Sequence, residues 1–205
     1  MSGADKRRLR VIADKTEKLL RTEFDPRQRD QIDMADDVAC KEGCNACCAQ
    51  YVSITPAEAT WILTRYPEVV RARRRALKAQ AVLEVECLTQ GTAEQGQAPS
   101  PLGTTANIYW RHRHACAFLK DSGSCSVYEA RPLACRAHVV QGDPAQCSVD
   151  DVNAQVRTLR MQELEILLYD EMSSWFDCPG QEQTMVLMPL AAGVLDLYLE
   201  TGGRI

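Results

Sequence analysis

The sequence contains no long hydrophobic run. No stretch of it approaches the roughly 18 consecutive apolar residues that a membrane-spanning helix needs. Residues 1–10 are polar and basic with no apolar segment behind them, which predicts that the chain carries no signal peptide. We therefore expect a cytoplasmic protein that has no membrane partner.

Positive charge is not in excess either. The chain has 24 lysines and arginines against 28 aspartates and glutamates, which gives a formal net charge of -4. This balance gives no general electrostatic support for binding nucleic acid, so we expect no nucleic-acid partner. Short basic clusters at residues 6–8 and 71–75 are expected to be solvated helix faces. The identity of any protein partner stays open.

Several signatures of common enzyme classes are missing. The sequence has no phosphate-binding loop, no glycine-rich dinucleotide fingerprint and no His-Glu-x-x-His motif. The apolar fraction of 45% is ordinary for a soluble globular protein, and 205 residues are enough for one sizeable core. We expect a single domain over residues 1–205, and no motif assigns a catalytic residue.

Cysteine is the residue that the sequence has in abundance. In a reducing cytoplasm, clustered cysteines indicate metal or redox chemistry rather than disulfides, although their even count leaves a disulfide framework open for another compartment. Two isolated cysteines, Cys87 and Cys178, are expected to be structural. The other eight form an early quartet and a later group: Cys40, Cys44, Cys47 and Cys48, then Cys116, Cys125, Cys135 and Cys147.

The quartet has two interpretations. Its spacing would place four small apolar side chains on one face of a buried helix, but Gly43 and Asn45 disfavour a regular helix there. Metal binding explains the spacing better, because a Cys-x2-Cys pair supplies two of the four thiolates that zinc takes. Cys48 is harder to place on the same ion as Cys47, since neighbouring side chains diverge. It would suit a second ion, a cluster edge or a supporting role.

Eight thiolates are enough for two four-coordinate sites or for one polynuclear centre. Zinc and iron both accept thiolates, so zinc, iron and an iron–sulfur cluster all remain open as cofactors. Arg131 and Arg136 are expected to offset the negative charge of the ligands from just outside them. Three histidines, His112, His114 and His138, are alternative ligands, of which His114 is the nearest in sequence to Cys116.

The hydrophobic pattern predicts a mostly α fold, with helices packed around a loop-rich cysteine metal-binding centre over residues 40–147. A capping box at Thr55 and Glu58 marks one helix start, and Asp25-Pro26 is expected to break the first helix. A polar segment rich in glycine and proline predicts a flexible insertion at about 89–107. Helices are expected over residues 5–22, 26–34, 55–66, 67–88 and 148–172, and after Pro189.

Together these motifs resemble a known family. The pattern Cys-x3-Cys-x2-Cys-Cys, followed by Cys-x-Phe-Leu, Cys-x-Val-Tyr-Glu-x-Arg-Pro and Cys-Arg, is similar to the YkgJ-type cysteine-cluster family over residues 40–147. Proteins of that family are described as zinc- or iron-chelating. The resemblance implies that the eight clustered cysteines hold the metal, with Cys147 in less distinctive surroundings. A flagellin lysine methylase resembles the family through a similar cluster, which is thought to hold an iron–sulfur centre.

Three functions are therefore compatible with the sequence. They are a metal-binding protein without assigned chemistry, an iron–sulfur enzyme related to that protein-modifying methyltransferase, and a metal chaperone or sensor. The spacing of Cys40, Cys44 and Cys47 also occurs in radical S-adenosylmethionine enzymes. That alternative is disfavoured because no alternating strand–helix pattern follows from which a barrel would be built.

Overall fold

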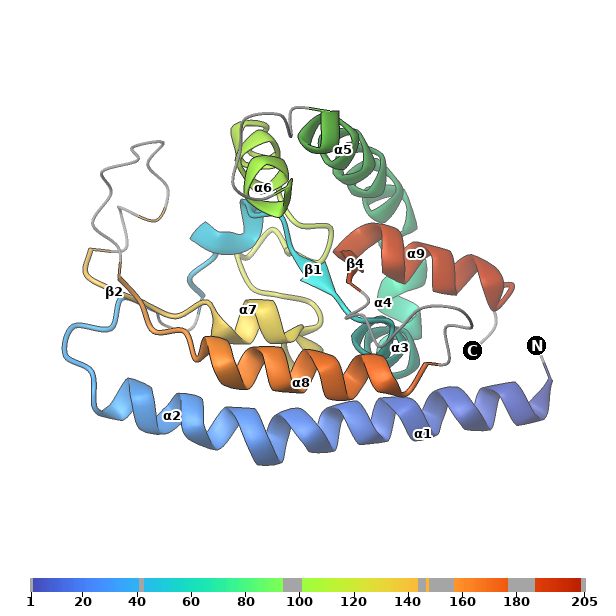
Figure 1. Cartoon of the computed structure of the whole chain (residues 1–205). Coiled ribbons are helices and arrows are strands. Elements are labelled where there is room, and N and C mark those ends of the chain that lie inside the picture. The colour runs from blue at the N-terminus through green and yellow to red at the C-terminus, as the bar shows by residue number, and fades with distance from the viewer. Residues whose placement is uncertain are drawn as a thin grey trace.

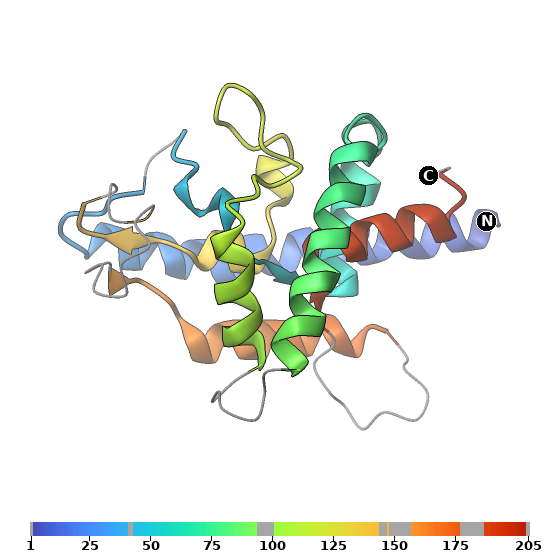
Figure 2. The same cartoon turned by 90° about the horizontal axis from the view of Figure 1, so that it is seen from above.

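The computed structural model describes residues 2–40, 43–93, 101–143, 147, 157–176 and 187–203. These residues are mostly helical, with a few two-residue strands, which confirms the predicted fold class (Figure 1). No helix among the described residues is long and apolar enough to cross a membrane. Most of the clustered cysteines lie on short turns and irregular chain between the longer helices (Figure 2).

The first two helices form one long rod along the molecule (Figure 1). Helix α1 (Gly3–Leu19) continues through a π-helical turn (Leu20–Phe24) into α2 (Asp25–Asp33). The predicted break at Asp25-Pro26 is therefore wrong. The N–H of Asp25 reaches the carbonyl of Leu20 instead, and Pro26 falls in the first turn of α2, where no N–H is needed. The extra residue in the turn keeps Leu20 and Phe24 fully buried.

The predicted capping box forms at the start of α3 (Pro56–Arg65). The N–H of Glu58 donates to the Thr55 hydroxyl at 3.2 Å, and the N–H of Thr55 donates to the Glu58 carboxylate at 2.7 Å. Helix α3 packs against α1 and carries the buried side chains Trp61 and Ile62 into the core. Strand β1 (Ser53–Ile54), just before the cap, pairs antiparallel with β4 (Met188–Pro189).

The predicted helix over residues 67–88 is two helices. It divides at Arg73 into α4 (Pro67–Ala72) and α5 (Arg74–Ala93). The two ends of the flexible insertion expected at about 89–107 are helical, because α5 runs to Ala93 and α6 (Pro101–Arg111) begins at Pro101; residues 94–100 lie outside the described part.

Close packing of α5 against α6 explains this difference, since tertiary contacts outweigh the weak local helix preference of this polar segment (Figure 2). At Gly91 an added Cβ would lie 2.3 Å from the Thr105 hydroxyl oxygen and 3.0 Å from the Thr105 nitrogen. The glycine that suggested a flexible segment therefore allows two helices to touch.

The C-terminal third also differs from expectation. The predicted helix over residues 148–172 is interrupted by β3 (Arg157–Thr158), which pairs with β2 (Val140–Gln141), and α8 (Gln162–Ser174) begins later. The N–H of Leu159 donates to the carbonyl of Val139 at 2.8 Å, a long-range bond that a helix here would lose. Residues 148–156 lie outside the described part. Helix α9 (Leu190–Glu200) follows Pro189, as predicted.

Replacing Gly91 with alanine should destabilise the protein although alanine is the better helix former. The intrinsic gain of ~1 kcal/mol is outweighed by overpacking against Thr105, which costs about 1–3 kcal/mol. The free energy of unfolding, measured by urea titration, should therefore fall. Gly3→Ala is the control, because a Cβ at Gly3 meets nothing within 4 Å. Equal or greater stability of Gly91→Ala would contradict the packing explanation.

Candidate metal centre

The backbone brings the early quartet and the later cysteines together. The N–H of Cys116 donates to the carbonyl of Cys48 at 2.7 Å. On the other side of the quartet, the N–H of Ala39 donates to the carbonyl of Val140 at 2.9 Å, which places Cys40 beside the strand that follows α7 (Leu133–Ala137). Segments from before and after residues 94–100 therefore meet at one place.

An inner group of four thiols gathers where these segments meet. It consists of Cys47 on the 3-10 turn Ala46–Ala49, Cys116, Cys125 and Cys135 on α7. Burial raises the pKa of Cys135 well above its usual range, and the neighbouring thiols Cys116, Cys47 and Cys125 raise it further. Burial and the nearby Cys125 and Cys47 also raise the pKa of Cys116 to about 12.

An outer group lies on the more open side of Cys47. Cys44 is exposed, and Cys40 and Cys147 are half-buried. Burial raises the pKa of Cys147, and Cys40, Cys44 and Cys47 add to that rise. Burial likewise raises the pKa of Cys40, with contributions from Cys44 and Cys47, and the N–H of Val140 at 3.4 Å from its sulfur opposes the rise.

Cys47 belongs to both groups. The raised pKa of Cys47 has its largest cause in a hydrogen bond with the thiol of Cys48, followed by burial. A thiol whose pKa is raised stays protonated at neutral pH, and the thiolate forms only if a cation compensates for it. The arrangement therefore supplies a set of neutral thiols that can release their protons to solvent when a cation binds.

The thiols do not form a finished coordination shell. In the described part of the chain, no group of three or more His, Cys, Asp or Glu side chains is already arranged to hold a metal ion. The donor chemistry fits zinc and iron, since all nine described cysteines are free thiols and thiolates are ligands of both metals. Binding an ion requires the thiol side chains to rotate toward one another.

Arg131 is the cation that acts on the largest number of the thiols. Its charge opposes the rise in pKa of Cys40, Cys47, Cys125 and Cys135. The guanidinium carbon lies 3.7 Å from the Tyr128 ring centroid, and among the described residues its buried Nε has no hydrogen-bond partner. Arg131 is thus placed where it offsets the negative charge of thiolates.

Arg136 points away from the thiols. Its Nη1 donates to both oxygens of Asp25, at 2.9 and 3.0 Å, and its Nε donates to the carbonyl of Arg131 at 2.8 Å. Another guanidinium nitrogen donates to the carbonyl of Glu129, and the guanidinium lies 5.3 Å from the Trp61 ring centroid. Arg136 therefore ties α7 to the α1–α2 rod, and any influence on Cys135 acts through the position of that helix.

His138 is the histidine most closely connected to the cysteine segments. The thiol of Cys40 lies 3.9 Å from its carbonyl oxygen, and its Nε2 lies 3.3 Å from the side-chain nitrogen of Gln50. His114 turns its Nδ1 toward the neighbouring carbonyl of Ala115, at 2.9 Å, and His112 is exposed. No described histidine belongs to either thiol group. Cys87 is buried on α5, and Cys178 lies outside the described residues.

A buried carboxylate holds the helix that carries Cys135. The N–H of Leu133, at the start of α7, donates to Glu58 at 2.6 Å, while the other oxygen of Glu58 serves the capping box of α3. Burial raises the pKa of this carboxyl, and the donors at Thr55 and Leu133 oppose that rise. The capping residue that the sequence predicted therefore also fixes the position of α7.

A second buried polar pair holds the segment that carries Cys116. The side-chain carbonyl of Gln80 accepts the N–H of Ala117 at 2.7 Å, and the Gln80 amide donates to Glu84 at 2.7 Å. Glu84 in turn accepts the N–H groups of Ala191 and Ala192, at 3.0 and 3.1 Å, at the start of α9. This relay connects α9, α5 and the Cys116 segment through fully satisfied hydrogen bonds.

Sequence reasoning missed this relay. Gln80 and Glu84 are four residues apart on α5 and are 2% and 0% exposed. They continue the line of buried residues from Leu77 to Cys87, so their position on that face was the available signal. Unless the buried face of the helix is recognised, a polar pair at this spacing on a charged helix is typical of a solvated surface.

Comparison with known families shows which family the cysteine region belongs to. A family model described as "Putative zinc- or iron-chelating domain", of the CxxCxxCC type, matches residues 39–157, which is more than half of the chain. The chain belongs to the CxxCxxCC family. The match confirms the resemblance to a zinc- or iron-chelating family and supports metal binding by this member. No curated protein and no solved structure matches the chain.

Family membership leaves the ligand set as a prediction. The CxxCxxCC name has two residues between its first cysteines, whereas three separate Cys40 from Cys44 in this chain. All eight predicted cysteine ligands lie within the matched region, and the structure describes each of them. Their grouping around Cys47 is therefore the geometry from which a function can be argued.

Replacing Gln80 with leucine should destabilise the protein. Leucine fills a similar volume but leaves the buried N–H of Ala117 and one oxygen of Glu84 without this partner, at a cost of about 1–3 kcal/mol. Urea unfolding in the presence of a chelator measures the loss without a contribution from metal. Gln90→Leu makes the same change at an exposed position of the same helix and should have little effect. A variant as stable as the parent would show that the relay carries no net stability.

Glu84 should also make stability depend on pH. Burial raises the pKa of Glu84 to about 7, from the 4.5 of an unperturbed glutamate, so the folded state binds the proton more tightly than the unfolded state. The stability that Glu84 contributes is fully present below its unfolded-state pKa of 4.5, and it is lost as the pH rises through the folded-state pKa of about 7. The change is on the order of 3 kcal/mol. The difference in unfolding free energy between the parent and Glu84→Gln, measured from pH 5 to pH 8, should follow this course. Glu86→Gln, at an exposed neighbouring position, is the control, and a flat difference would contradict the assignment.

Proposed function

We propose that the protein binds zinc or iron through the eight clustered cysteines and that the inner group forms the tighter site. The observation that carries the proposal is the gathering of Cys47, Cys116, Cys125 and Cys135 from four separate segments into one partly buried region. Four thiolates complete the tetrahedral shell of a structural zinc site or of an iron centre. Such an ion would join the quartet to the later cysteines.

The supporting residues favour binding over a passive buried core. Arg131 faces four of the thiols, and a thiolate centre needs compensating positive charge nearby. The segments that carry Cys116 and Cys135 are fixed by Gln80 and Glu58. The ion would therefore bind to a scaffold whose backbone is already fixed at two of its four segments.

The outer group supports a second candidate, an exchangeable site. Cys44 is exposed and Cys147 is half-buried, so an ion held by Cys40, Cys44 and Cys147 would be open to incoming ligands. Metal chaperones and sensors need such access, whereas a structural ion does not. In this proposal Cys48, in contact with Cys47, lies beside the boundary between the two sites.

Serine substitution should separate the two groups. Cys135→Ser should lose the inner ion and lower the free energy of unfolding, because metal binding contributes to folding stability when the site is incomplete without it. Cys44→Ser should lose no more than the outer ion. Elemental analysis of anaerobically purified protein gives metal per chain, and urea unfolding with and without chelator gives the stability. Cys87→Ser, outside both groups, should change neither quantity.

The same preparation distinguishes the metals. A colourless protein with stoichiometric zinc supports a four-thiolate zinc site. A brown protein that contains iron and acid-labile sulfide instead supports an iron–sulfur centre and the enzyme alternative. Unchanged metal content in Cys135→Ser would remove the inner group from the proposal, and metal-free protein that takes up neither zinc nor iron anaerobically would overturn metal binding itself.

A further inference from the structure

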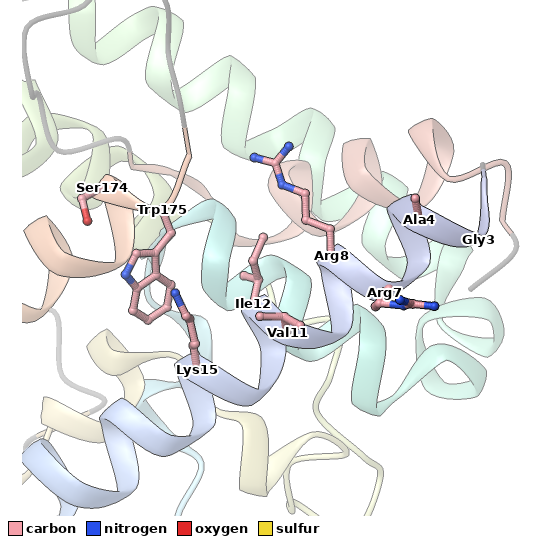
Figure 3. A pocket seen from close by; sticks show the side chains of 9 residues that line it. All are labelled: Gly3, Ala4, Arg7, Arg8, Val11, Ile12, Lys15, Ser174 and Trp175. Carbon is pink, nitrogen blue, oxygen red and sulfur yellow. The ribbon is translucent and has the colours of Figure 1, made fainter.

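A basic groove lies beside the N-terminal half of α1, away from the cysteines (Figure 3). It is a hollow of about 920 Å³ between α1 and the end of α8. Figure 3 shows Trp175 facing one flank of α1, with Lys15 beside its indole ring. The residues that define the groove are three cations and three apolar side chains: Arg7, Arg8, Lys15, Val11, Ile12 and Trp175.

Among the described residues, few carboxylates lie near the cations of the groove. In the part of the chain that the structure describes, Arg7, Arg8 and Lys15 form no ion pair, and the Lys15 ammonium instead lies 5.5 Å from the Trp175 ring centroid. Two acids of α1, Asp14 and Glu17, both bind Arg65 of α3 at 2.7 Å. The third, Asp5, is hydrogen-bonded to Ser2 and also lies within electrostatic range of Arg8. The groove therefore presents concentrated positive charge around an apolar floor, although the protein as a whole is negative.

An acidic knob lies at the opposite end of the same rod, where α2 ends (Figure 1). Its apolar tip is Met34, whose side chain is 79% exposed, the highest value among the described large hydrophobic residues. The four carboxylates around the tip are exposed and form no ion pair among the described residues. The knob is defined by Asp30, Asp33, Met34, Asp36 and Asp37.

We propose that the basic groove of one copy receives the acidic knob of a second copy. The two patches are opposite in charge and similar in number of charged groups, with three cations in the groove against four carboxylates on the knob. A methionine at the centre of the knob suits a floor of Val11 and Trp175, because the thioether adapts to irregular apolar surfaces and favours contact with aromatic rings. Each patch thus supplies what the other lacks.

The contact joins two molecules rather than the two ends of one. Arg8 and Met34 are 26 residues apart on a nearly continuous helical rod, which at 1.5 Å per residue separates them by roughly 40 Å.

A reciprocal pair of copies and a longer head-to-tail series both satisfy the same contact. Because the patches are small and charged, the association is weak, reversible and reduced by salt. No cysteine takes part, so the inference is independent of metal binding.

Charge exchange between the two patches tests this contact. The groove variant is Arg7→Glu/Arg8→Glu, and the knob variant is Asp33→Arg/Asp36→Arg. Sedimentation equilibrium at low salt, from about 10 μM to about 1 mM protein, should show the mass of the parent rising with concentration. Each variant alone should associate at least about tenfold more weakly, because like charges then face each other. An equimolar mixture of the two should associate again, since every contact between them pairs opposite charges.

The control is Lys6→Glu/Arg10→Glu, which reverses the same number of charges on α1 outside the groove. It should associate like the parent, and Met34→Ser should associate more weakly than the parent. Circular dichroism confirms that each variant keeps its helices. A parent that remains monomeric throughout, a control as weak as the groove variant, or a mixture that stays monomeric would each overturn the proposal.

Discussion

Two buried carboxylates hold the cysteine segments against the helical core. Glu58 receives the first N–H of α7, and Glu84 acts through Gln80 on the residue after Cys116. A buried carboxylate is costly unless its oxygens receive strong hydrogen bonds, so each of these groups requires its partners to stay in place. The position of two thiol-bearing segments is thereby linked to the start of α3 and of α9, which are regular helices of the core. The irregular chain around the cysteines needs no regular structure of its own.

This scaffold has an electrostatic consequence for the thiols. It gathers them in a partly buried region, and this raises the pKa values of six of them: Cys40, Cys47, Cys116, Cys125, Cys135 and Cys147. The charge of Arg131 opposes the rise at four of the six. Neutral thiols tolerate such burial, whereas several thiolates without a cation would not. Release of thiol protons and entry of a cation are therefore coupled in the proposed site, and its affinity must rise with pH. The rotation that closes the inner group can remain small because the backbone around it is already fixed.

The sequence predicted the parts of this arrangement that local chemistry determines. The cysteine spacing identified the quartet, and the Thr55–Glu58 capping box was found from four residues. Features that depend on distant partners were missed. The π-helical turn exists because Leu20 and Phe24 must both reach the core, and the polar segment at Gly91 is helical because Thr105 packs directly onto it. The buried pair on α5 resembled a solvated face, since a polar residue in a sequence does not reveal which groups meet it after folding.

The number of thiols in each group gives a reason why the inner and outer sites should differ in affinity. Four thiolates around one divalent ion carry two net negative charges. Around the inner group, Arg131 and Lys120 both lower the pKa of Cys125, so two cations oppose those two charges. In the outer group, Arg131 lowers the pKa of Cys40, and Lys120 has no such effect there. An ion held there by Cys40, Cys44 and Cys147 would carry one net negative charge, which Arg131 can oppose, so charge alone does not separate the two groups. The difference lies in ligand number and access. Four thiols can complete the shell of an inner ion, whereas three thiols, one of them exposed, leave an outer ion open to incoming ligands, and this favours a retained inner ion beside an outer one that exchanges.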